Sequence, residues 1–400
     1  MGQLAERVGQ FAPSGTLKMT ALARQLAAEG REIIALSSGE PDFPTPDNIK
    51  EAGIRAIREN VTKYTATDGT PDLKRAISRK LAADNGLDYP PEQIVVANGT
   101  KPLLLAAMMA LADPGDEVIV PAPYWVSYPE VARIVGASPV FVPCPASSGF
   151  RLRPDAFEAA ITERSRVLVI TSPHNPTGAV YRREDMEALV PVLRRHPRLW
   201  VLTDEIYEHI FYNGGKPVSF AAVDRDLAER VVVTNGFSKG YVMTGWRLGF
   251  AAGPRPAIQA MSKILGNIAG PPNAVSQAAA VEALLGEQPY LEHNVAVFRE
   301  RRDLAVEALN QMPGITCAPP DGAFYLFAGC AGVLGRRAPD GAVIASDTDF
   351  VHCAAMHAGV VMVPGSAFGL SPYFRITYAL ATDRLRTALE RLRRFCNALS

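Results

Sequence analysis

The sequence is most informative at NGFSKGYVMTGWRLG (residues 235–249), which directly follows the apolar run at residues 231–233. That run is typical of a short buried strand, so Lys239 stands at a strand exit. Burial disfavours a charged ammonium, and the neutral amine that results can attack a carbonyl to form a Schiff base. Arg247 offers a permanent cation for bidentate binding of a phosphate. A carbonyl and a phosphate on one ligand indicate pyridoxal phosphate; a surface Lys and Arg on a loop is the alternative.

Length and composition narrow the class of protein. The chain has 400 residues, which favours two domains, and its 41 basic and 41 acidic residues cancel. No basic field is therefore expected to bind nucleic acid or an anionic membrane. The apolar run at residues 103–112 is too short to span a bilayer, and residues 1–7 lack the apolar region of a signal peptide. We expect a cytoplasmic protein.

Cysteine and histidine usage argues against structural metal or disulfide chemistry. The five cysteines have no CxxC spacing, and the six histidines do not cluster. We expect buried, inert thiols in a reducing compartment and no metal site.

Apolar runs alternate with helical patterns, such as residues 183–194, along the first two thirds of the chain. The runs occupy residues 94–97, 118–120, 167–170, 200–202 and 231–233, and each ends in Gly, Pro or polar residues. This alternation predicts an α/β fold: a three-layer α/β/α large domain with a mainly parallel sheet. Ligands of such sheets bind beyond the carboxyl ends of the strands, where all five polar motifs fall.

The last third follows a different pattern. Gly270-Pro-Pro272 breaks the chain, and a long helix is expected from about residue 290 to 312. Strands are expected at residues 323–328, 360–363 and 374–379, followed by a basic amphipathic helix at 382–399. The sequence therefore predicts a large cofactor-binding domain at residues 46–289 and a smaller α+β domain at 290–400.

Three residues are candidates for tuning the cofactor, beside Lys239 as nucleophile and general base. Asp204 would keep the pyridine nitrogen protonated so that the ring can accept electrons; its alternative role is a helix N-cap. Tyr207 and Asn175 would donate hydrogen bonds to the phenolic oxygen, although Asn175 could also be a turn residue only.

The phosphate is expected at a strand-to-helix turn. Backbone N–H groups of Gly99 and Thr100, at a helix N-terminus, form a ready anion site. Ser238 and Arg247 would complete it.

Two further side chains suit the ring and the substrate. Trp125 would lie on the face of the cofactor ring, with a core tryptophan as the alternative. Arg375 alternates with apolar neighbours on a strand, and its guanidinium suits a substrate α-carboxylate. A surface salt bridge is the alternative for Arg375.

Taken together, these motifs resemble those of class I/II, fold-type I aminotransferases, in the branch of bacterial aspartate aminotransferases that includes prephenate transaminases. The resemblance covers nearly the whole chain and its motifs are specific to the family. They are Pro13-Ser-Gly-Thr16, Gly39-Glu-Pro-Asp-Phe43, Lys63-Tyr64 with Gly69, Asn98-Gly-Thr-Lys101, Pro123-Tyr-Trp-Val-Ser-Tyr128, Asn175-Pro-Thr-Gly178, Asp204-Glu-Ile-Tyr207, Ser238-Lys239, Gly365-Ser-Ala-Phe368 and Phe374-Arg375.

The resemblance implies a homodimer with active sites at the subunit interface. Tyr64 would reach the phosphate of the neighbouring subunit's cofactor. Gly39 and Trp125 would contact substrate, and Asn175 and Arg375 would hold its α-carboxylate. Residues 1–45 would form an N-terminal arm and part of the small domain, which closes over the substrate.

The resemblance also implies a substrate class. In this branch, a lysine at Lys101 and a threonine at Thr16 help to bind a distal carboxylate, which favours transfer from L-aspartate to 2-oxoglutarate by a ping-pong mechanism. Gly236, His174 and residues 267–272 depart from the pattern. Ile268 and Ala269 would make the substrate end of the pocket more apolar, so an aromatic or prephenate aminotransferase remains an alternative.

Two other functions use the same fold. A carbon–sulfur lyase or cyclopropane-forming synthase would keep the cofactor residues, but the Thr16 and Lys101 pair makes it less favoured. A cofactor-binding transcription regulator needs an added DNA-binding domain. The motifs start near residue 13, which leaves no room for one.

Overall fold

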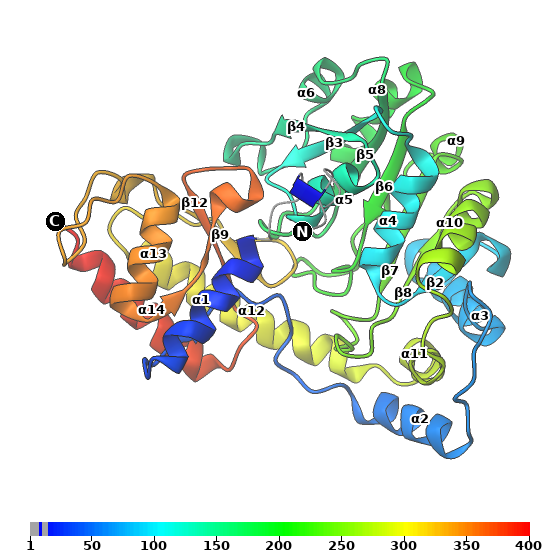
Figure 1. The fold of residues 1–400 in the computed structure, drawn as a ribbon, viewed down its shortest axis with the longest axis horizontal. Helices are drawn as coiled ribbons and strands as arrows, with labels where there is room; N and C mark the ends of the chain where they lie inside the picture. Colours follow the sequence, from blue (N-terminus) through cyan, green and yellow to red (C-terminus); the bar gives the residue numbers. More distant parts are fainter. Residues whose placement is uncertain (1–7, 10–14) are drawn as a thin grey trace, which may run out of the picture.

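The computed structural model describes residues 8–9 and 15–400, so Pro13 and Ser14 of the first motif lie outside the described residues. Within them, a seven-stranded sheet has the order β2-β8-β7-β6-β5-β3-β4 (Figure 1). Its strands are β2 (Ile94–Ala97), β3 (Glu117–Ala122), β4 (Ser138–Pro143), β5 (Ser165–Thr171), β6 (Trp200–Asp204), β7 (Val231–Gly236) and β8 (Gly249–Ala252). Only β8 runs antiparallel to its neighbours, so the other six carboxyl ends share one edge.

Both faces of this sheet are buried, which explains its continuous apolar runs. Val232 belongs to the apolar cluster that includes α4, α5 and α10, whereas Val231 and Val233 belong to the cluster that includes α2, α3 and α11. The helices on the face of Val232 are α4 (Thr100–Leu111), α5 (Ser127–Ile134) and α10 (Arg255–Ile268). Within the described residues, the face of Val231 and Val233 carries seven helices, several of them short. They are α2 (Asp47–Arg58), α3 (Pro71–Lys80), α6 (Pro154–Ala159), α7 (Arg183–Glu187), α8 (Val190–Arg195), α9 (Arg225–Ala228) and α11 (Ala274–Leu285). The expected three-layer fold is confirmed.

The long helix α12 (Pro289–Asn310) leads into a smaller α+β part with its own apolar core. That part holds β9 (Tyr325–Gly329), β10 (Val360–Val361), β11 (Val363–Pro364), β12 (Tyr373–Thr377), α13 (Asp347–Ala358) and α14 (Thr382–Asn397). The N-terminal segment joins it: α1 (Gly15–Ala28) packs there, and β1 (Ile34–Ala35) pairs in parallel with β10 (Figure 1).

Several element boundaries differ from the sequence prediction, and three of the differences have a physical cause. The helix expected at residues 183–194 is two helices, and Pro191 stands in the first turn of the second, where a missing N–H is tolerated. The strand expected from residue 323 begins at Tyr325, because Ala323 has a φ of 55°. The strand at 360–363 divides at Met362, because its halves pair with different partners.

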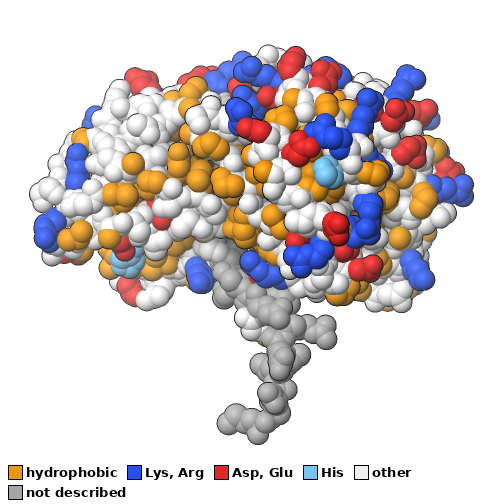
Figure 2. Space-filling view, turned by 90° about the horizontal axis from the view of Figure 1, so that it is seen from above, with side chains coloured by type: hydrophobic (Ala, Val, Ile, Leu, Met, Phe, Trp, Pro, Cys, Tyr) orange, Lys and Arg blue, Asp and Glu red, His pale blue; other side chains and the backbone are white. Residues whose placement is uncertain are grey.

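The visible surface charges and the cysteines bear on the expectations from composition. Figure 2 shows basic and acidic side chains intermixed on the face it presents. No helix in the described part of the chain has the length and apolarity needed to cross a bilayer. All five cysteines are free and buried.

Candidate active site

A cavity of about 350 Å³ opens at the carboxyl edge of the large sheet. It brings together twelve residues that the sequence analysis selected: Thr16, Gly39, Thr100, Lys101, Trp125, Asn175, Asp204, Tyr207, Ser238, Lys239, Arg247 and Arg375. They come from α1 and β12 as well as from the strand ends of the sheet. Gly99 adjoins the cavity, whereas Tyr64 does not line it.

Lys239 extends from the turn after β7 toward the segment that follows β1. Its Nζ donates a hydrogen bond to the Gly39 carbonyl at 2.6 Å. Burial lowers the pKa of Lys239 to about 8, with the charge of Glu40 opposing this shift. A lysine with this pKa has roughly two orders of magnitude more neutral amine at pH 7 than a free lysine. This amine is therefore available as a nucleophile.

Asp204 ends β6 and is only 3% exposed. Tyr128 Oη donates to Asp204 Oδ2 at 2.8 Å, and the Ile206 N–H donates to Oδ1 at 3.3 Å. No helix begins directly after Asp204 in the described chain, so the helix N-cap considered above is wrong, and the carboxylate lines the cavity. Burial raises the pKa of Asp204 to about 6, although Tyr128 and Lys239 lower it.

Tyr128 is a site residue that sequence reasoning missed. It lies on α5, is buried, and its hydroxyl contacts Thr171 Oγ1 as well as Asp204. The sequence quoted Tyr128 within a motif but offered no sign of its partner. Thr171 and Asp204 lie 43 and 76 residues away, so only the packing of α5 on the sheet reveals the contact.

The residues expected to bind the phosphate meet at the N-terminus of α4. Gly99 precedes the helix with a φ of 101°, and a Cβ placed there would lie 2.5 Å from Arg247 Nη2. A Cβ on Gly249 would lie 2.9 Å from Thr100 N. The two glycines therefore allow the backbone amides of α4 and the Arg247 guanidinium to come close together. Ser238 lies on the same cavity.

Arg375 is 2% exposed, which excludes the surface salt bridge considered above. Its Nη1 donates to Asn175 Oδ1 at 2.9 Å and its Nη2 to the Ser37 carbonyl at 2.8 Å. Its Nε has no hydrogen-bond partner in the described chain. Burial lowers the pKa of Arg375. The result is a cation that is held firmly and incompletely neutralised.

Tyr207 faces the cavity beside a second tyrosine that the sequence did not single out. The hydroxyls of Tyr207 and Tyr325 lie 2.9 Å apart. Lys239 Nζ lies 6.0 Å from the centre of the Tyr207 ring. Tyr325 also packs its ring 4.4 Å from the Arg375 guanidinium, so it links the lysine and arginine regions of the cavity.

The far end of the cavity carries the two residues expected to bind a distal carboxylate. Thr16 on α1 and Lys101 on α4 both line it. Lys101 Nζ lies 5.3 Å from the centre of the Trp125 ring. Trp125 is half-buried and also lines the cavity, so it is not simply a core residue.

One expectation about the pocket is not met within a single chain. Ile268 and Ala269 do not line the cavity, because α10 packs on the sheet through Met261 and Leu265 and its end emerges at the surface. Ile268 is 48% exposed. His174, the other departure, is buried against Thr177, and burial lowers its pKa to about 4.

Comparison with known proteins gives a consistent result. The family described as "Aminotransferase class I and II" matches residues 31–392. The chain is 48% identical to an aspartate aminotransferase of Rhizobium meliloti (strain 1021) over 398 residues, covering 100% of this chain and 97% of the relative. It is 46% identical to an aspartate/prephenate aminotransferase of Cereibacter sphaeroides (strain ATCC 17029 / ATH 2.4.9), with 100% of both chains covered.

Comparison with solved structures finds the same family. The crystal structure of the aspartate aminotransferase from Rhizobium meliloti superposes with a TM-score of 0.98 at 48% identity, covering 100% of both chains. The aspartate aminotransferase from Thermus thermophilus with maleate gives a TM-score of 0.92 at 37% identity, covering 99% of this chain and 100% of the other.

Proposed function

Since the chain belongs to the class I and II aminotransferases, which depend on pyridoxal phosphate, we propose that it transfers the amino group of L-aspartate to 2-oxoglutarate. The observation that carries this proposal is the cavity itself. It is lined by Lys239, by Arg375 for one carboxylate, and by Thr16 and Lys101 as polar groups for a second. The relatives reported above carry the same activity in their names.

The residues of the cavity fit the cofactor. The anion site at Gly99, Thr100 and Arg247 suits a phosphate, and Trp125 offers an aromatic face. Lys239 supplies an amine that is readily deprotonated. When bound, pyridoxal phosphate supplies a carbonyl for covalent attachment and a ring that accepts electrons from the substrate α-carbon.

The chain's own residues then divide the work. Lys239 Nζ would act as the base that removes the α-proton of the substrate and returns a proton. The Asp204 carboxylate would hold a proton on the ring nitrogen, and the Tyr207 hydroxyl would donate to the phenolic oxygen. Arg375 orients the α-carboxylate with Asn175.

Lys101 provides a test of substrate choice. Replacing Lys101 with Ala is expected to raise KM for aspartate at least tenfold, because a hydrogen bond to a charged group contributes about 1.5–3 kcal/mol. KM for phenylalanine should change little, since that side chain has no carboxylate. Steady-state kinetics with both donors measures this. Equal losses for both donors, or faster turnover of phenylalanine by the unaltered enzyme, would instead support an aromatic aminotransferase.

Tyr128 provides a test of the Asp204 role. Because the Tyr128 hydroxyl lowers the pKa of Asp204, its removal in Tyr128→Phe should raise that pKa above the present value of about 6. Cofactor binding needs the carboxylate, so affinity should fall as pH drops through about 6 in the unaltered apoenzyme, and from a higher pH in the variant. Affinity at pH 7 should fall roughly tenfold.

Titration of the apoenzyme with pyridoxal phosphate between roughly pH 5 and 8 measures both effects. Tyr290→Phe is the matched control, because the buried Tyr290 hydroxyl has no hydrogen-bond partner within the described residues. An unchanged pH midpoint in Tyr128→Phe would remove Tyr128 from the site's electrostatics.

We also propose a homodimer in the cytoplasm. Tyr64 is 96% exposed, and Ile268, which follows Gly266 on α10, is also exposed. A Cβ on Gly266 would lie 3.9 Å from Thr67, so these two segments are neighbours on the surface. A partner subunit would cover them and receive Tyr64 at its phosphate site. The division proposed within each subunit is 46–289 for the large domain, with 1–45 and 290–400 in the small one.

A further inference from the structure

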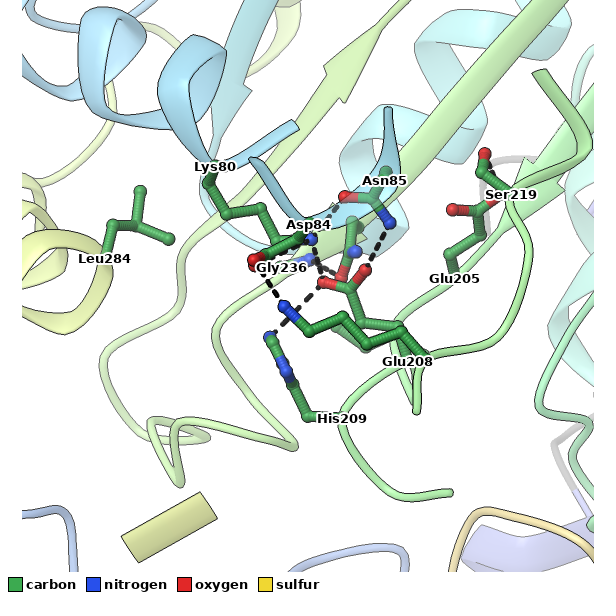
Figure 3. Close-up of polar contacts among 12 residues, drawn as sticks. Lys80, Asp84, Asn85, Glu205, Glu208, His209, Ser219, Gly236 and Leu284 are labelled. Carbon is green, nitrogen blue, oxygen red and sulfur yellow. Dashed lines mark hydrogen bonds and ion pairs between the residues drawn. The ribbon is translucent and has the colours of Figure 1, made fainter. Parts of the chain in front are cut away.

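A group of buried and partly buried polar side chains lies outside the residues that line the cavity (Figure 3). We call Lys80, Asn85, Glu208 and His209 the Lys80 cluster. Lys80 and Glu208 are 5% and 7% exposed and form an ion pair. Burying two charges is costly unless each finds further partners, so a buried pair of this kind contributes little stability over apolar residues of similar size. Stability alone therefore does not explain why this charged pair is buried.

An unusual helical turn assembles the cluster. Helix α3 continues into a π-helical turn, η2 (Leu81–Asn85). Residues five apart lie about 140° apart around an α-helix, whereas the i→i+5 bonding of a π turn brings Lys80 and Asn85 to one side. Lys80 Nζ donates to Asn85 Oδ1 at 2.7 Å, and Asn85 Nδ2 donates to Glu208 Oε2 at 2.9 Å. The Glu208 carboxylate is thus held from two directions.

The charges of the cluster are balanced. Burial alone would raise the pKa of Glu208, but the charge of Lys80 and the hydrogen bonds from Lys80 and Asn85 lower it to about 2, so the carboxylate stays ionised. Burial lowers the pKa of His209, although Glu208 opposes this, which favours a neutral ring. At the rim, Asp84 pairs with Lys216.

The cluster contacts both segments that carry the reactive groups. Glu208 and His209 directly follow Tyr207, and the turn is closed by bonds from Glu208 N to the Glu205 carbonyl at 3.0 Å and from Ile210 N to the Tyr207 carbonyl at 2.8 Å. On its other side, His209 Nε2 lies 3.0 Å from the hydroxyl of Tyr241, two residues beyond Lys239.

Gly240 packs so closely against His209 that no side chain fits between them. A Cβ at that position would lie 2.7 Å from His209 Cδ2, so the backbone next to Lys239 rests directly on the histidine ring. A shift of His209 would therefore be transmitted both to Tyr207 and to Lys239.

We propose that Glu208 and His209, held by Lys80 and Asn85, are positioning residues that set the placement of Tyr207 relative to Lys239 and so the affinity for pyridoxal phosphate. This inference rests on the proposed function. It assigns a role to groups that touch neither the cofactor nor the substrate.

The test uses the full-length variants Glu208→Gln and His209→Gln. Three quantities are measured: Kd of the apoenzyme for pyridoxal phosphate, the pH midpoint of the visible absorbance of the bound cofactor, and Tm of the apoenzyme. We expect Kd to rise at least about tenfold and the midpoint to move by at least about half a pH unit in both variants. His209→Gln removes no charge, so it serves if Glu208→Gln fails to fold.

Glu117→Gln is the matched control. Glu117 is another buried carboxylate, held by Thr162, Ser165 and Arg164, but it lies at the opposite, amino end of β3. The Glu117→Gln variant should have a lower Tm but the same Kd for pyridoxal phosphate and the same pH midpoint. Cluster variants that lower Tm in the same way but keep both cofactor readouts within about twofold of the unaltered protein would show a purely structural role and overturn the inference alone. Unaltered protein that binds no pyridoxal phosphate would overturn the proposed function as well.

Discussion

Replacing Lys239 with Ala is expected to abolish covalent attachment of pyridoxal phosphate and to lower kcat by roughly 10⁴-fold or more. The magnitude follows from the two roles proposed for one amine, which is both the point of attachment and the base that moves the α-proton. Its low pKa, the Gly39 contact and the neighbouring Asp204 are specific to this position. No other lysine in the cavity lies against Tyr207, since Lys101 lies at the Trp125 end.

Mass spectrometry after borohydride reduction checks the attachment directly. The unaltered protein should retain the mass of the cofactor on the peptide that contains Lys239, and the variant should not. Lys263→Ala, an exposed lysine on α10, is the control and should behave like the unaltered protein. Normal attachment and turnover in Lys239→Ala would refute the central assignment of the site.

The strand-end motifs could be predicted because the topology of a parallel sheet fixes where the ends of its strands lie. The polar residues after β5, β6 and β7 need no knowledge of their partners, since parallel strands deliver all their carboxyl ends to one edge. Asn175, Asp204 and Lys239 therefore came together as expected. The helix predicted at 183–194 was wrong in its extent, because Pro191 begins a second helix there.

Contacts between distant elements could not be predicted in the same way. The pairing of Tyr128 with Asp204 depends on how α5 packs on the sheet. The pairing of Lys80 with Glu208 depends on a π-helical turn, which the hydrophobic periodicity of the sequence does not predict. Ile268 illustrates a different limit. It does not line the cavity of its own chain, and its proposed neighbour is a second subunit, which a single sequence does not show.

The second large effect is expected at Arg375. Replacing it with Lys should lower kcat/KM for aspartate roughly a hundredfold, because losing one hydrogen bond between charged groups costs about 1.5–3 kcal/mol. Asn175 and the Ser37 carbonyl fix the guanidinium plane and leave its Nε free. A lysine keeps the charge but offers a single point of contact in place of a planar fork. Steady-state kinetics gives the loss, and the absorbance of the bound cofactor should stay unchanged.

Arg230→Lys is the matched control for this change. Its Nη1 donates to the carbonyls of His196 and Leu199 at 3.0 and 2.8 Å, but it precedes β7 at the end of the sheet opposite the cavity. This variant should lose stability and keep kcat/KM. A loss of activity as large as that of Arg375→Lys would mean that the effect arises from folding and not from carboxylate binding.

Donor dependence separates the two ends of the cavity. Every amino acid has an α-carboxylate, so Arg375→Lys should reduce kcat/KM by a similar factor for aspartate and phenylalanine. Lys101→Ala should reduce it for aspartate alone. If Arg375 and Lys101 bind different carboxylates of one substrate, the two losses should add in free energy for aspartate in the double variant. A double variant no worse than Arg375→Lys would mean that Lys101 does not bind the second carboxylate.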